Sequence, residues 1–89
     1  MAYSDTHVEP ASLLGAHSLP DDLYRAGLAY ATGTCTEVNL VEAHKWFNLA
    51  AARGHEEARA QRQDMAEMLT SAEIKMALEA ARDWLKLAN

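Results

Sequence analysis

This 89-residue chain has one cysteine and four histidines, the side chains that could carry thiol chemistry or bind a transition metal, and a histidine can also act as an acid or base. They are Cys35, His7, His17, His44 and His55. No two of them stand four residues apart, the spacing that places two zinc ligands on one face of a helix. A metal site would therefore need a chance meeting of the cysteine with the histidines. We expect histidines that face solvent or cap helices, and no metal.

Catalysis by the thiol or by paired carboxylates has little support in the sequence. A reactive cysteine needs a base or positive charge beside it, and the spacing assigns none to Cys35. The acidic pairs 21–22 and 56–57 stand where helices are expected to begin, and the helix dipole accounts for them there. We predict that the protein is not an enzyme and holds no cofactor.

The charge is spread unevenly along the chain. Residues 1–44 carry one base, Arg25, against six acids, whereas residues 45–89 carry seven of each sign, and the net charge is −5. An acidic protein without a basic stripe is a poor candidate for binding nucleic acid or an anionic membrane surface. We therefore expect no nucleic-acid and no membrane partner. A single cysteine, together with the lack of a signal-peptide pattern, predicts a cytoplasmic location.

The elements that must position any site are predicted to be helices. Hydrophobic residues make up 49% of the chain, much of it alanine, and glycine and proline are scarce. Apolar spacing of three and four predicts an all-α domain over residues 20–89 with four helices, at about 21–31, 40–53, 56–68 and 71–88. Two capping boxes support these starts: Asn39 with Glu42, and Thr70 with Glu73. Residues 1–19 show no such period, and we expect a flexible arm that is dispensable for folding.

Large aromatic side chains stand next to the smallest residues in the segment EAHKWFNLAAARGHEEA, residues 42–58. Small residues let two helices approach closely, so we expect Trp46 to be buried at a tight helix–helix contact. Gly27 lowers the propensity of its helix, and we expect another backbone to lie close to it. One face of the last helix carries six apolar residues: Ile74, Ala77, Leu78, Ala81, Trp84 and Leu85. Of these, we expect Ile74, Leu78, Ala81 and Leu85 to turn inward onto residues 56–68.

The segment LYRAGLAYATGTCTEVNLVEAHKWFNLAAARGHEEA, residues 23–58, resembles the Sel-one-like repeat, a relative of the tetratricopeptide repeat. The first helix and its loop match the pattern at Tyr24, Gly27, Tyr30 and Gly33. The second helix and its exit match at Ala43, Trp46, Phe47, Ala50, Ala51, Gly54 and Ala58. The pattern has leucine, glycine, valine and aspartate where this chain has Ala26, Cys35, Thr36 and Asn39. Since cysteine tolerates positive φ less well than glycine, we expect the loop to follow a different backbone path.

This resemblance implies a fold and a function. The expected fold is a short α-α superhelix of antiparallel helical hairpins, a tetratricopeptide-like solenoid with one full repeat and a C-terminal capping hairpin. The implied function is a non-enzymatic adaptor or scaffold that binds another protein through its helical-repeat surface. We place four residues near that surface: Asp22, Arg25, Ala29 and Gln61. The alternatives are a homodimer formed through the exposed repeat face and, third, a small enzyme or metal-binding protein.

Overall fold

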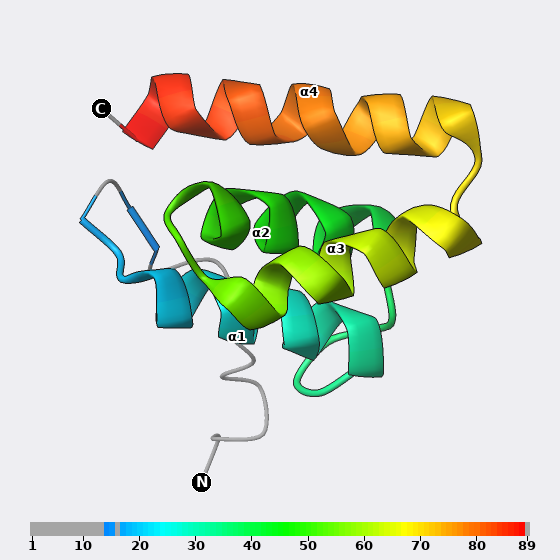
Figure 1. Cartoon of the computed structure of the whole chain (residues 1–89), viewed down its shortest axis with the longest axis horizontal. Coiled ribbons are helices and arrows are strands. Elements are labelled where there is room, and N and C mark those ends of the chain that lie inside the picture. The colour runs from blue at the N-terminus through cyan, green and yellow to red at the C-terminus, as the bar shows by residue number, and fades with distance from the viewer. Residues whose placement is uncertain (1–13, 16, 89) are drawn as a thin grey trace, which may run out of the picture.

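A computed structural model describes residues 14, 15 and 17–88 of the chain (Figure 1). It contains four α-helices: α1 (Pro20–Thr32), α2 (Leu40–Ala52), α3 (Glu56–Met68) and α4 (Ser71–Ala88). The part of the chain that is described contains no β-strand, so the predicted all-α class is confirmed. Each helix begins and ends within one residue of its predicted bounds. None of these helices is both long and apolar enough to cross a membrane.

The starts of α2 and α4 are held by local side-chain caps. The predicted box before α4 forms in both directions: Thr70 Oγ1 accepts from the Glu73 amide at 3.1 Å, and Glu73 Oε1 accepts from the Thr70 amide at 2.8 Å. The box before α2 forms only in part. Asn39 Oδ1 accepts from the Glu42 amide at 3.1 Å, but the Glu42 carboxylate accepts from Trp46 Nε1 at 3.0 Å. Glu42 therefore serves the tryptophan instead of closing the box.

The central helix of the fold is α2, which packs against α1, α3 and α4. Its alanines let the neighbours approach, and its two aromatic residues fill the space between them. Trp46 is 1% exposed, and its ring meets that of Trp84 on α4 edge to face, with centroids 5.2 Å apart. Its predicted burial is confirmed.

The close approach expected at Gly27 involves a side chain and not a backbone. A Cβ atom built on Gly27 would lie 2.5 Å from Cδ1 and Cε1 of Phe47. The Phe47 ring is fully buried, and the Tyr24 ring lies against it with centroids 5.7 Å apart. The glycine in α1 therefore makes room for the phenylalanine of α2. This contact explains why a small residue of one helix lies opposite a large residue of the other.

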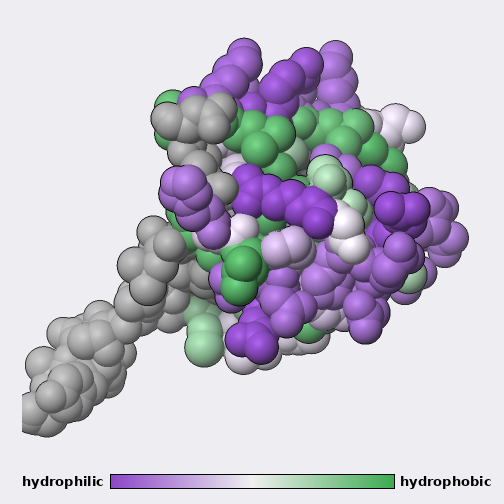
Figure 2. Space-filling view, turned by 60° about the vertical axis from the view of Figure 1, so that its left-hand side comes forward, coloured by the Kyte–Doolittle hydropathy of each residue, from purple (hydrophilic) through white to green (hydrophobic). Residues whose placement is uncertain are grey.

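The packing of α4 differs from the prediction. This helix packs on α2 and makes little contact with α3, so the expected packing on residues 56–68 is wrong. Its buried positions are Ala77 and Ala81, whereas Leu78 is 44% and Leu85 42% exposed. The prediction that both leucines face inward is wrong, because the contact between Trp84 and Trp46 turns the small alanines toward α2. A hydrophobic band is visible along the upper part of Figure 2, at the height of α4.

The segment before α1 contacts the helices. Leu14 packs against the hydrophobic core, and the Ser18 carbonyl accepts from Arg53 Nη1 at 2.8 Å. A turn holds this segment, because the Gly15 amide donates to Ser18 Oγ at 2.9 Å. The arm predicted over residues 1–19 therefore includes residues attached to the domain. Residues 1–13 lie outside the described part.

Candidate functional site

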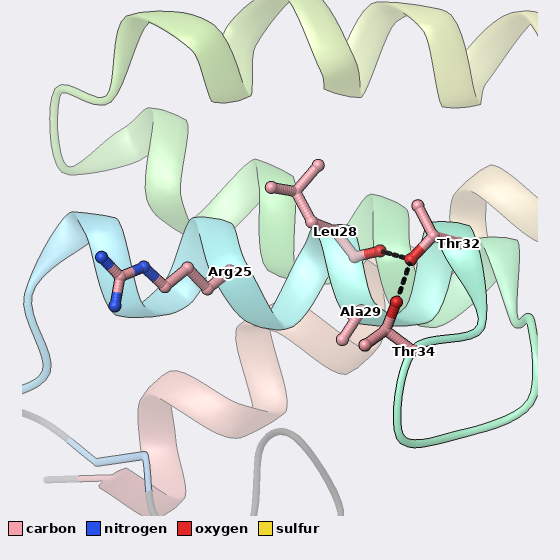
Figure 3. A pocket seen from close by; sticks show the side chains of 5 residues that line it. All are labelled: Arg25, Leu28, Ala29, Thr32 and Thr34. Atoms are coloured by element: carbon pink, nitrogen blue, oxygen red, sulfur yellow. Dashed lines mark hydrogen bonds between the residues drawn. The ribbon is translucent and has the colours of Figure 1, made fainter.

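A shallow, open hollow of about 210 Å³ lies on the face of α1 that is turned away from α2 (Figure 3). The buried side of α1 is formed by four residues: Leu23, Ala26, Gly27 and Tyr30. The hollow lies on the opposite side of the helix. Four of its lining residues share that side of α1, and a fifth comes from the loop after the helix: Arg25, Leu28, Ala29 and Thr32, with Thr34 from the loop. The lining is mostly apolar, so the hollow suits an apolar side chain of a ligand.

The polar groups at the loop end of the hollow satisfy one another. Thr32 Oγ1 donates to the Leu28 carbonyl at 2.8 Å and lies 2.9 Å from Thr34 Oγ1 (Figure 3). Because the Thr32 hydrogen is used in the first bond, the Thr34 hydroxyl donates in the second. The two threonines thus form a fixed wall, which leaves Leu28 and Ala29 as the apolar floor.

A cation stands at the other end of the hollow. The Arg25 side chain is exposed and points along α1 toward the N-terminal end of the helix (Figure 3). It makes no ion pair with any residue of the described ranges. The apolar floor and this guanidinium, which extends from it toward the start of α1, can together hold a ligand that carries both an apolar group and a carboxylate.

The predicted surface residues divide into two groups. Arg25 and Ala29 lie together in the hollow. Asp22 lies outside it at the start of α1, where its carboxylate accepts from the Leu19 amide at 3.3 Å. Gln61 is half-buried on α3 and is not part of the lining. Helical spacing from Arg25 predicts that Leu28 and Thr32 lie on the same face of α1. No pattern in the sequence indicates that the loop after α1 positions Thr34 beside them.

His55 links the start of α3 to α1. Its Nδ1 accepts from the Ala58 amide at 3.1 Å as the N-cap, so its Nε2 carries the hydrogen and donates to Asp21 Oδ1 at 2.9 Å. The ring also stacks on Tyr24, with centroids 4.2 Å apart. Both ring nitrogens are engaged, so this histidine has no free nitrogen for general base catalysis in this arrangement.

His44 is the buried histidine of α2. It is 3% exposed, and its Nδ1 has no hydrogen-bond partner among the residues that the structure describes. Burial lowers the pKa of His44 below the ordinary value of 6.5, and the Arg62 guanidinium lowers it further. Arg62 itself donates to Asn48 Oδ1 at 2.9 Å. This imidazole is therefore a neutral core group at neutral pH and does not reach the hollow on α1.

Cys35 lies exposed in the loop between α1 and α2 and adopts a φ of 65°. A cysteine thus takes the left-handed conformation that favours glycine, the residue that the repeat pattern has at this position. Among the described residues, no three of the types His, Cys, Asp and Glu gather as a possible metal site.

Comparison with known proteins identified no relative: no family model, no curated protein and no solved structure matches the chain.

Proposed function

We propose that the protein is a non-enzymatic interaction module that binds a partner protein through the outer face of α1. The observation that carries this proposal is the hollow itself, which combines an apolar floor with the Arg25 guanidinium, a cation that has no ion-pair partner among the described residues. Two of the residues selected from the sequence, Arg25 and Ala29, line it. A fixed helix presents such groups at little entropic cost, which favours recognition of another protein.

The Sel-one-like repeat and its tetratricopeptide-like superhelix are part of the same proposal. The contact between Gly27 and Phe47 supports it, because it joins α1 and α2 as a tight hairpin through residues of the repeat pattern. Gly54 supports it too, since this glycine ends α2 with a φ of +96°. In this proposal α1 and α2 are the one full repeat, and α4 covers the other side of α2.

The positions of the two described helix-associated histidines support a role without catalysis. His55 uses both ring nitrogens in structural hydrogen bonds, and His44 is enclosed in the core. The single cysteine favours a reducing compartment, and the cytoplasm is the location that we propose.

The proposal can be tested by affinity purification from the native cells followed by mass spectrometry. The tagged wild-type chain is compared with Ala29→Arg, which fills the hollow with a long cation. Ala52→Arg, at an exposed position of α2, is the matched control. We expect a partner that is recovered with the wild type and the control and lost with Ala29→Arg. Equal recovery with all three chains would contradict binding through α1.

The second candidate function is self-association through the same face. It is favoured by the position of the hollow, which no other described helix covers. Light scattering over a range of concentrations distinguishes the two candidates. A mass that doubles with concentration, and that Ala29→Arg returns to the monomer value, would favour the homodimer.

A further inference from the structure

A second apolar surface lies on α4, far along the chain from the hollow. It is a stripe of residues spaced by four, three and four: Ile74, Leu78, Ala81 and Leu85. Ala81 is buried and Ile74 half-buried, whereas both leucines are more than two-fifths exposed. The stripe therefore runs along the border of the face of α4 that packs on α2. Figure 2 shows a hydrophobic band at the level of α4, beneath a row of hydrophilic side chains.

Two cations border this stripe on the side that is turned away from α2. Lys75 and Arg82 each follow a stripe residue directly, which places them about 100° further around the helix. Both are exposed, and neither forms an ion pair within the described ranges. Glu79 and Lys86 stand one row further out. We call the four stripe residues together with Lys75 and Arg82 the α4 edge.

We propose that the α4 edge docks an amphipathic helix of a partner protein whose leucine-like side chains pack on Leu78 and Leu85 and whose carboxylates pair with Lys75 and Arg82. The two exposed leucines, Leu78 and Leu85, stand one heptad apart on the same side of α4, a spacing at which a second helix can pack alongside, and this selects another helix as the occupant. The charge of the border selects acidic residues at the flanking positions of that helix. This surface is distinct from the hollow on α1, so the inference goes beyond the proposed function and does not depend on it.

A second copy of α4 fits this edge poorly. In an antiparallel pair of α4 edges, the row with Lys75 and Arg82 would face the same row of the other copy, and like charges would repel. In a parallel pair, Lys75 and Arg82 of one copy would face the side of the other copy's α4 that holds Ala77 and Trp84. That side already packs on α2, and Trp84 contacts Trp46 there. Charge and packing therefore both favour a partner with acidic flanks over self-association.

The test uses two synthetic amphipathic helices as probes. Both carry leucines at alternating spacings of three and four; one has glutamate at the flanking positions, and the other has lysine. Binding of each labelled peptide to the full chain is measured by fluorescence anisotropy. We expect the glutamate peptide to bind about tenfold more tightly than the lysine peptide, because two exposed pairs change from attraction to repulsion.

Two double variants and one control variant locate the site. Lys75→Glu with Arg82→Glu changes only exposed side chains, so it should fold and should reverse the preference between the peptides. Leu78→Ala with Leu85→Ala should abolish binding of both peptides. Leu87→Ala, which changes a leucine of α4 that is 86% exposed and off the stripe, should leave binding unchanged. Helical circular dichroism confirms that each variant is folded.

Four results would overturn the inference. They are no binding of either peptide, equal binding of both peptides, no reversal by the paired glutamate variant, and the same loss of binding with Leu87→Ala. A concentration-dependent dimer that the Leu78 and Leu85 substitutions abolish would also overturn it, in favour of a second copy. Arg25→Glu, on α1, should not change peptide binding, so failure of the α1 proposal and failure of this one are distinguishable.

Discussion

Gly27→Ala offers a sharp test of the packing between α1 and α2. In an exposed helix, replacing glycine by alanine stabilises the protein by about 1 kcal/mol. Here the added methyl group would lie 2.5 Å from two ring carbons of Phe47. The sign of the effect should therefore reverse, and the protein should lose stability.

The magnitude follows from the surroundings of the ring. Overpacking a core costs about 1–3 kcal/mol, and the gain in helix propensity offsets about 1 kcal/mol of this. Phe47 is fully buried, with the Tyr24 ring beside it, so the ring cannot move aside freely. We expect a net loss of about 1–2 kcal/mol in the free energy of unfolding, which corresponds to a Tm lower by roughly 4–16 °C in a domain of this size.

The assay is thermal unfolding followed by circular dichroism, with a double-mutant comparison. In a Phe47→Leu background the ring is absent, so Gly27→Ala should raise Tm instead of lowering it. Ala29→Gly is the matched control on α1, and it should cost about 1 kcal/mol through helix propensity. A Gly27→Ala protein that melts at a higher temperature than the wild type would refute the close contact between glycine and ring.

Three further predictions concern the core, the buried histidine and the loop. Trp46→Ala should lower the free energy of unfolding by about 3–5 kcal/mol, because the indole is 1% exposed and donates to Glu42; wild-type stability in a denaturant titration would contradict its structural role. The protein should lose stability as the pH falls through about 6.5, because His44 protonates more readily in the unfolded chain, where its pKa is not lowered. This contribution is fully present above that pH, and His44→Leu should remove it from the pH profile of the denaturation midpoint; a profile that the substitution leaves unchanged would contradict the prediction. Cys35→Gly should stabilise the protein by about 0.5–1 kcal/mol, because Cys35 has a φ of 65°, and a lower Tm would show that the loop is not strained there.

The helix ends could be predicted because their signals are local. Thr70 and Glu73 are three residues apart and cap α4 in both directions, whatever the rest of the chain does. Glu42 shows the limit of such reasoning. The sequence pattern predicts that its side chain closes a capping box with Asn39. In the structure its carboxylate instead accepts a hydrogen bond from Trp46, one turn later in α2.

The rotation of α4 could be predicted only in part, because its apolar face contains two adjacent stripes. The larger side chains of Ile74, Leu78 and Leu85 favoured the stripe that also holds Ala81, whereas the structure fully buries only Ala81 of these four, together with Ala77 of the neighbouring stripe. What decides between the stripes is the edge contact of Trp84 with Trp46, between residues far apart in the chain. Burial of small residues allows this close approach, and hydrophobicity alone does not reveal it.

The candidate site could be predicted only where it follows the helix. Arg25 and Ala29 share a face of α1 by simple spacing, and the hollow includes both. Thr34 joins it because Gly33 reverses the chain with a φ of +80°. The link between His55 and Asp21 spans 34 positions. Such contacts depend on the packed fold and leave no periodic signal in the sequence.

Site-specific photocrosslinking in the native cells tests directly whether a partner protein binds the outer face of α1. A photoreactive amino acid is placed at position 29, inside the hollow, and in a second chain at position 52, an exposed position of α2. We expect a crosslinked product of one defined mass from position 29 and none from position 52. The same products from both positions, or none from position 29, would contradict binding of a partner through the outer face of α1.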